Sequence, residues 1–155
     1  MKKALIIILV LACLAGCLSG CGGDKVVESM DFAALSTALL DAGIYSDLMS
    51  PLEKDIAAML YSLDESDISE CMLYCGTGAT VEEIALFKAV DEAAAGRIAQ
   101  AANNRKAAQK TSFENYVPEE LPKLDKAIIK SSGLFVVYIV ATDDAKAQEI
   151  LKTYM

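Results

Sequence analysis

Leu134-Phe-Val-Val-Tyr-Ile-Val-Ala141 is the stretch that decides the fold, because it is apolar at both odd and even positions. A half-exposed strand alternates apolar and polar residues, whereas a strand covered on both faces is apolar throughout. Gly133 comes directly before the stretch, and Ala127–Lys130 lies just upstream. We therefore expect a hairpin about Ser132-Gly133 whose second strand, Leu134–Thr142, is buried on both faces or central in its sheet.

A helix is expected after this hairpin. Thr142 or Asp143 is suited to cap its N-terminus, because both side chains accept hydrogen bonds from backbone N–H groups. The apolar residues that follow share one helical stripe: Ala147, Ile150, Leu151 and Tyr154. The C-terminal third of the chain is thus predicted to form a strand-strand-helix unit.

A second strand-strand-helix unit is expected upstream. Glu70–Gly76 and Glu83–Val90 are predicted strands joined by Thr77–Thr80. The alternative for the second strand is a helix, because Thr80-Val81-Glu82-Glu83 also has the spacing of a capping box. Asp91 then begins the longest predicted helix, which runs to about Ser112.

The residues before these units predict two short helices. Asp31 can cap the first, whose stripe is Phe32, Leu35, Leu39 and Ala42, and Gly43 is a suitable stop. Ser50-Pro51-Leu52-Glu53 combines a capping box with proline at the first helical position, and predicts the second. The fold class is therefore α+β: two N-terminal helices, then two strand-strand-helix units, with one mainly antiparallel sheet packed against helices. Tyr116-Val-Pro118 and Pro122 predict an irregular connector between the units.

The N-terminus has the pattern of a lipoprotein export signal. Lys2-Lys3 is followed by an uncharged apolar run over residues 4–15. Leu14-Ala15-Gly16-Cys17 and Leu18-Ser19-Gly20-Cys21 both fit the lipobox, in which small residues precede the cysteine that becomes lipidated. We favour Cys21, with Cys17 as the alternative. The predicted organisation is a signal peptide over 1–20, a lipid-anchored tether over 21–30 and one domain over 31–155.

The lipobox pattern predicts both a cellular location and one binding partner. A diacylglyceryl group on the N-terminal cysteine holds a protein stably at a membrane, because two acyl chains bind far more tightly than one. We expect the chain at the outer face of the cell membrane, with membrane lipid as its first partner. An ordinary secretory signal or an uncleaved anchor helix is the simpler alternative, and two lipoboxes at the right place argue against it.

Composition excludes some functions. The formal net charge of −8 disfavours nucleic-acid binding, because such a surface repels phosphate. The chain has no histidine, which removes the usual general base and the commonest metal ligand. We therefore expect no cofactor, no metal site and no catalytic motif.

Cys71 and Cys75 remain in the predicted domain. If Cys71-Met-Leu-Tyr-Cys75 is a strand, their Cα atoms lie ~13 Å apart at ~3.3 Å per residue. A disulfide needs roughly 4.4–6.8 Å. We expect two small core residues on one face of the strand, and a redox pair or metal site is the sharper alternative.

One family resemblance covers most of residues 55–150. It rests on Glu83-Ile-Ala-Leu-Phe-Lys-Ala89, Arg105, Gln109, Phe113, Tyr116-Val-Pro118, Gly133-Leu-Phe-Val-Val137 and Leu60-Tyr61-Ser62-Leu63-Asp64, where Ser62 replaces an expected glycine. The chain resembles uncharacterised lipoproteins of Gram-positive bacteria that share domain of unknown function 4358. The resemblance implies attachment to the outer face of a single membrane, and it transfers no activity.

Three functions remain open. The favoured one is a binding or protein-interaction module at the cell envelope, with an envelope protein as possible partner. The second is a carboxylate- or Ser/Lys-based envelope hydrolase, whose candidate residues, Glu82, Glu83, Asp91 and Lys88, are more simply surface charges or caps. The third is a structural envelope lipoprotein. Arg97 and Arg105 lie eight apart on the long predicted helix, so they can bind an anion together, although pairing with acidic residues is the simpler expectation.

Overall fold

The computed structural model describes residues 26–155. The predicted signal peptide, both lipobox cysteines and the first residues of the tether lie outside this range. The elements follow the chain in this order: α2 (Phe32–Asp41), β1 (Ser50–Leu52), α3 (Lys54–Tyr61), the 3₁₀ turn η1 (Glu65–Asp67), β2 (Ile68–Cys75), β3 (Glu83–Ala89), α4 (Glu92–Phe113), the 3₁₀ turn η2 (Pro118–Glu120), α5 (Leu121–Asp125), β4 (Ile128–Ser132), β5 (Phe135–Val140) and α6 (Asp144–Leu151). No helix of this range is long and apolar enough to cross a membrane.

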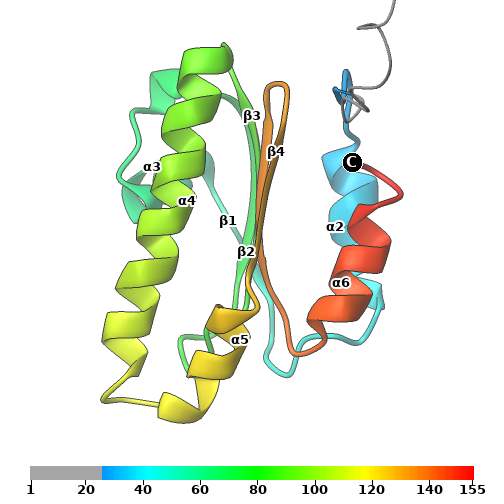
Figure 1. Ribbon diagram of the computed structural model, residues 1–155. Helices are drawn as coiled ribbons and strands as arrows, with labels where there is room; N and C mark the ends of the chain where they lie inside the picture. The colour runs from blue at the N-terminus through cyan, green and yellow to red at the C-terminus, as the bar shows by residue number, and fades with distance from the viewer. Residues whose placement is uncertain (1–25) are drawn as a thin grey trace, which may run out of the picture.

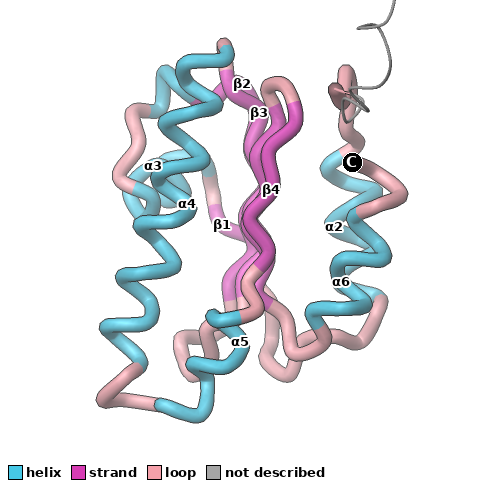
Figure 2. Tube along the Cα trace, viewed as in Figure 1, coloured by secondary structure: helices cyan, strands magenta, loops and turns pink. Residues whose placement is uncertain are grey.

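The five strands form one antiparallel sheet in the order β1-β2-β3-β5-β4. Helices α3, α4 and α5 lie on one side of the sheet, and α2 and α6 lie on the other (Figures 1 and 2). All six residues of β5 are buried, and β5 lies between β3 and β4. The predicted α+β architecture and the covered position of the second hairpin strand are therefore confirmed.

Two apolar cores, one on each face of the sheet, explain why the central strands are apolar at both odd and even positions. On β3, Ala85 and Phe87 pack into the core beneath α3 and α4. Their neighbours Ile84 and Leu86 pack into the core beneath α2 and α6. Successive side chains of a strand point to opposite faces, so a sheet covered on both sides needs apolar residues at every position.

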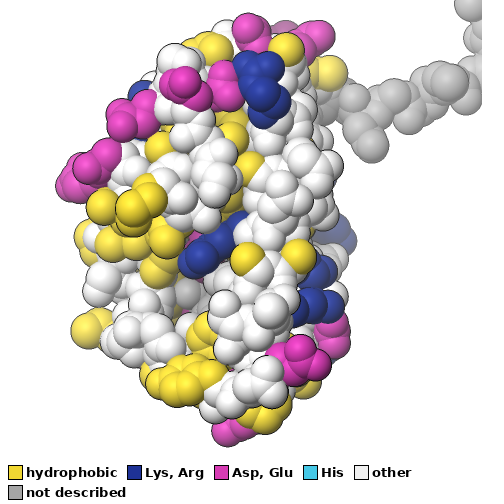
Figure 3. Space-filling view, turned by 90° about the vertical axis from the view of Figure 1, so that its left-hand side faces the viewer, with side chains coloured by type: hydrophobic (Ala, Val, Ile, Leu, Met, Phe, Trp, Pro, Cys, Tyr) yellow, Lys and Arg dark blue, Asp and Glu magenta, His cyan; other side chains and the backbone are white. Residues whose placement is uncertain are grey.

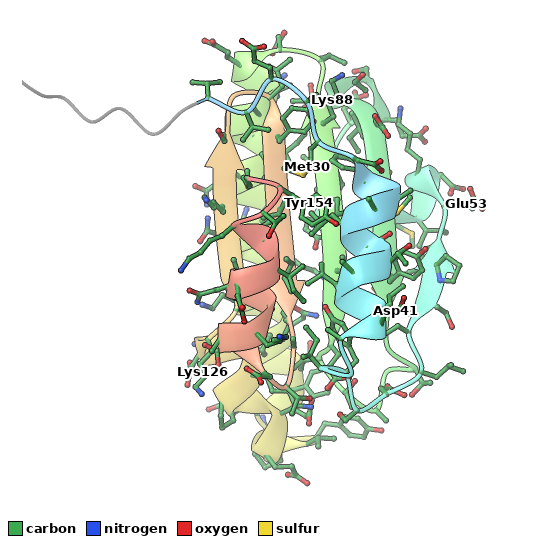
Figure 4. All side chains as sticks on the ribbon, turned by 90° about the vertical axis from the view of Figure 1, so that its right-hand side faces the viewer. Met30, Asp41, Glu53, Lys88, Lys126 and Tyr154 are labelled. Atoms are coloured by element: carbon green, nitrogen blue, oxygen red, sulfur yellow. The ribbon has the colours of Figure 1, made fainter. Side chains whose placement is uncertain are left out.

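Helices α2 and α6 lie side by side over the second core (Figure 4). Met30 and Tyr154 are partly buried against this core, and Figure 4 shows both between the two helices. Phe32 at the start of α2 packs edge-on against Phe135 of β5, with ring centroids 6.0 Å apart. The two ends of the described chain therefore meet on one face of the sheet.

Three of the predicted helix starts are confirmed by side-chain caps. Asp31, Asp91 and Asp143 each accept a hydrogen bond from the backbone N–H three residues later. This spacing is that of an N-cap side chain bonded to the third helical N–H. The predicted hairpin is also present, and Gly133 adopts the positive φ of 57° in its turn.

The predicted capping box at Ser50-Pro51 is wrong. Ser50–Leu52 forms edge strand β1 and pairs with β2, so that Pro51 lies opposite Tyr74. Helix α3 begins at Lys54, and its N-cap residue Glu53 makes no side-chain cap bond. Proline lacks an N–H donor, which an edge strand tolerates on its open side. Pairing with β2 has therefore overridden a local helix signal.

Two further outcomes concern the segments around α4. The predicted second strand of the upstream unit is confirmed as β3, and the helical alternative at Thr80-Val81-Glu82-Glu83 does not form. The connector after α4 is more regular than predicted, because η2 and α5 lie within it. Both prolines of the connector, Pro118 and Pro122, lie in the first turn of these short helices, where a missing N–H leaves no bond unmade.

Candidate functional site

A groove runs between α4 and the segment formed by α3 and η1. Its volume is about 660 Å³. It is lined by Leu60, Tyr61, Ser62, Leu63, Asp64, Ser66, Asp67, Arg97, Gln100, Ala101, Asn104, Arg105 and Ala108. The space-filling view of this side shows a basic side chain near the top among acidic ones and another basic side chain near the centre (Figure 3). Both arginines singled out in the sequence thus belong to one groove.

At the upper end of the groove, Arg97 pairs with Asp67 of η1. Its Nε and Nη2 atoms donate to the two carboxylate oxygens at 2.8 and 2.6 Å. The hydrogen bonds from Arg97 hold the pKa of Asp67 below its usual range. This bidentate pair fastens η1 to the first turns of α4.

Deeper in the groove, Arg105 reaches the buried carboxylate of Glu83 on β3. The Nη2–Oε2 distance is 2.9 Å, and the Glu83 side chain is only 1% exposed. Tyr61 of α3 donates to the same carboxylate at 2.6 Å, and Gln109 of α4 donates at 2.9 Å. Tyr138 of β5 donates to Gln109 at 2.6 Å. A buried charge is tolerated when a cation and several donors surround it in this way.

The two arginines do not converge on a shared anion. The groove brings both to one wall, but each guanidinium is bound to its own carboxylate, Asp67 for Arg97 and Glu83 for Arg105. The simpler expectation, pairing with acidic residues, is what the structure shows.

Glu82 is the centre of a second buried polar cluster, next to Glu83 in the chain but with a different set of partners. Its carboxylate accepts hydrogen bonds from the backbone N–H groups of Ser46 and Asp47, and from the hydroxyls of Ser46 and Thr142. Lys123 of α5 donates to it at 2.9 Å. Four segments of the chain therefore meet at one carboxylate.

The charge of Glu82 is strongly stabilised. Burial opposes ionisation, but the hydrogen bonds from Ser46, Lys123 and Thr142 outweigh it and lower the pKa of Glu82 to about 2. Lys123 also pairs with Glu120 at 2.9 Å. Although burial opposes its charge as well, these two carboxylates raise the pKa of Lys123 above its usual value.

The expectation that Glu82 and Glu83 are surface charges is wrong, since both are 1% exposed. The sequence did not identify Tyr61, Gln109, Ser46, Lys123 or Thr142 as their partners. The one available signal was a pair of carboxylates directly before the apolar run Ile84-Ala-Leu-Phe87. The other two candidates match the simpler expectation: Asp91 caps α4, and Lys88 lies over the ring of Phe135.

Cys71 and Cys75 both lie on β2, as predicted, and their thiols are free. Both pack against the core beneath α3 and α4. Burial, together with the nearby charge of Glu83, raises the pKa of Cys75 to about 12. A thiol with such a pKa is protonated near neutral pH and is a poor nucleophile.

These geometries limit the chemistry that the described residues can perform. Ser46 and Lys123 are in contact, with Oγ and Nζ 3.2 Å apart. A Ser-Lys hydrolase needs a neutral lysine to take the serine proton. Here two carboxylates hold Lys123 in its charged form, and Ser46 donates its hydroxyl to Glu82. Within residues 26–155, no cluster of three or more potential ligands suits a metal ion.

The comparison with known proteins gives one relationship. No curated protein and no solved structure matches the chain. The family model described as Domain of unknown function (DUF4358) matches residues 42–141. This range includes the whole sheet, the groove, both buried glutamates and all their partners except Thr142, while α2 and α6 lie outside it. The chain belongs to the DUF4358 family.

Proposed function

We propose that the protein is an extracytoplasmic lipoprotein, anchored to the membrane through Cys21 or the alternative Cys17, whose domain binds a protein partner. The two consecutive lipoboxes behind a charged and then apolar N-terminal segment support the anchor. The groove between α3 and α4 supports the binding role. This groove is the single observation on which the proposed binding role rests.

The walls of this groove are suited to a peptide segment. Leu60 and Leu63 offer partly buried apolar surface from the α3 side. Gln100 and Asn104 offer amide groups from the α4 side, and they are bonded to each other through one donor and one acceptor at 3.1 Å. The remaining amide donors and acceptors can bond to a peptide backbone, which needs both kinds of partner.

The charges of the groove favour binding over hydrolysis. Both arginines are bound to carboxylates, so neither is free to stabilise a developing negative charge. The buried carboxylate of Glu83 accepts from three side chains and is not free to activate water. A structural role without a ligand gives no reason for an open groove of this size.

The test is a crosslinking pull-down of the full chain from native membranes, comparing two substitutions on α4. Ala108 is exposed and lines the groove, so Ala108→Arg places a long side chain across it. Ala107 is exposed on the same helix and does not line the groove, so Ala107→Arg is the matched control. A partner that is recovered with the wild type and Ala107→Arg but lost with Ala108→Arg supports the proposal. A partner that is retained by Ala108→Arg contradicts it.

The anchor is tested separately with Cys17→Ala and Cys21→Ala. We expect one of the two substitutions to release the protein from the membrane fraction, and Cys21→Ala is the favoured one. Retention of both single variants and of the double variant in the membrane fraction would contradict lipidation.

A further inference from the structure

The two edges of the sheet are built differently. At one edge, β1 contributes only three residues, one of them Pro51, and β2 has a register shift between Ile68 and Glu70. Short strands, proline and bulges are the usual means of preventing an edge from pairing. At the other edge, β4 has five residues in unbroken register with β5 and contains no proline. Figure 1 shows β4 nearest the viewer, with no described helix or strand in front of it.

The register shows which backbone groups of β4 face outward. The backbone N–H of Ala89 donates to the carbonyl of Leu134, so Leu134 directs its backbone groups toward β3. Successive residues of a strand direct these groups alternately to the two neighbouring strands. Even-numbered residues of β5 therefore bond to β3, and odd-numbered ones bond to β4. The partners of these odd residues on β4 are Ile128, Lys130 and Ser132. Ile129 and Ser131 therefore direct their N–H and C=O groups away from β5. Within residues 26–155 these groups have no hydrogen-bond partner.

A second groove runs alongside this open edge, between β4 and α6. Its volume is about 320 Å³, and its lining includes Ile128, Lys130, Gln148, Leu151 and Lys152. Neither lysine has a carboxylate side chain as partner in the part of the chain that the structure describes, and Lys130 donates to the main-chain oxygen of Met155 at 3.1 Å. On a protein with a net charge of −8, these two lysines make the groove a local site of positive charge.

We propose that β4 pairs with an extended acidic peptide segment of a partner protein, which adds a sixth strand to the sheet. Backbone hydrogen bonds to Ile129 and Ser131 supply the pairing, as in other cases of strand addition. Carboxylates on the side of the added strand that faces α6 meet Lys130 and Lys152, which gives the preference for acidic sequences. This surface is separate from the groove between α3 and α4, and it requires neither that groove nor the anchor.

A second copy of the protein is a poorer occupant than a partner peptide. A second copy could offer its own β4 or its opposite edge. Antiparallel pairing of two β4 strands would bring the lysines of both copies together on one face of the joined sheet, which is unfavourable. At the opposite edge, β1 has only three residues and β2 has a register shift. We therefore commit to a segment from another protein and treat self-association as a competing outcome.

The test measures binding of synthetic peptides to the full chain in nonionic detergent by fluorescence anisotropy. The probe is a labelled octapeptide of alternating Glu and Val, compared with the alternating Lys and Val octapeptide and with an N-methylated form of the acidic one. We expect saturable binding of the acidic probe, roughly tenfold weaker binding of the basic one because attraction to two lysines becomes repulsion, and none of the N-methylated one. Hydrogen exchange should slow in β4 when the acidic probe binds.

Variants of β4 separate strand addition from general attraction to positive charge. Ser131→Pro removes an N–H that points outward, so the ladder with β5 is kept while pairing at the edge is blocked. Ser131→Val retains the N–H and is the control. We expect Ser131→Pro to abolish binding of the acidic probe and Ser131→Val to retain it. A double Lys130→Glu, Lys152→Glu variant should reverse the preference between the acidic and basic probes.

Three results would overturn the proposal. One is the absence of saturable binding of the acidic probe at millimolar concentration. Another is undiminished binding to Ser131→Pro while circular dichroism shows the variant folded. The third is concentration-dependent self-association in sedimentation that is lost in Ser131→Pro, because a second copy would then be the occupant.

Discussion

Replacing Glu82 with glutamine should destabilise the protein, and the loss should depend on pH. The substitution keeps the shape of the side chain but replaces one acceptor oxygen with an NH₂ donor. That donor then faces the backbone N–H groups of Ser46 and Asp47, or the ammonium of Lys123, all of which need an acceptor. Removing one partner from a buried charged network costs about 2–4 kcal/mol. We expect the free energy of unfolding to fall by this amount near pH 7.

The pH dependence follows from the pKa of Glu82. A decrease from 4.5 to about 2 on folding corresponds to at most about 3 kcal/mol, at about 1.36 kcal/mol per pKa unit. Glu82 also lines a small surface pocket, and screening by nearby solvent reduces this to about 2 kcal/mol. Because the folded-state pKa is the lower one, the stabilisation is complete above about pH 5 and is lost as the pH falls toward about 2.

The assay is urea denaturation of the wild type and Glu82→Gln at pH 7 and pH 3. The difference in free energy of unfolding should narrow by about 1–2 kcal/mol at the lower pH, because the wild type then loses most of what the ionised Glu82 contributes. Glu119→Gln is the control, since Glu119 is exposed and lies in η2, directly before the helix α5 that carries Lys123. An equal difference at the two pH values, or a loss no larger than that of Glu119→Gln, would refute the reasoning.

Three further predictions concern other parts of the fold. Tyr61→Phe removes the donor to buried Glu83 and should lower the free energy of unfolding by about 1–3 kcal/mol, whereas Tyr116→Phe at an exposed site should leave it unchanged in the same denaturation assay. Gly96→Ala should stabilise the protein, because a Cβ there meets no atom within 4 Å and alanine favours a helix. The free energy of unfolding should rise by about 0.5–1 kcal/mol and the thermal midpoint should rise with it. A lower midpoint would contradict the open space around this residue. Near pH 8, Cys75 should react with iodoacetamide much more slowly in the folded protein than in the urea-unfolded protein, because folding raises the pKa of its thiol to about 12. Peptide mass mapping measures the two rates. Equal rates would show that the thiol is not buried beside Glu83.

Local sequence signals predicted much of the fold. The caps at Asp31, Asp91 and Asp143 depend on a side chain and an N–H three residues apart, so a short window of sequence contains all the information. The covered strand β5 was likewise recognised from its own residues, because a strand between two layers must be apolar at every position.

The same local signals were insufficient at Ser50-Pro51. These two residues satisfy both the start of a helix and the edge of a sheet. Pairing of β1 with β2, which is more than twenty residues away along the chain, decided between the two. Short-range preferences of this kind amount to less than about 1 kcal/mol per residue, so tertiary pairing overrides them.

The candidate site was much less accessible to sequence reasoning. The partners of Glu82 and Glu83 lie between 22 and 60 residues away, on α3, α4, α5 and the loops at the end of the sheet. Arg105 was singled out for its position on a helix, but its carboxylate partner was not identified. No window of sequence contains such a network, because the strands bring its members together only after the sheet has formed.

What the sequence determined by itself was therefore the set of elements with short-range causes: the strands of the two hairpins, the capped helices, and the N-terminal pattern from which the anchor is predicted. The tertiary structure alone decided that β1 is a strand, that two adjacent glutamates are buried among separate sets of partners, and that β4 is left as an open edge. The physical reason is range. Backbone periodicity and capping act within about four residues, whereas the burial of a charge or the pairing of an edge depends on groups that are distant in the chain.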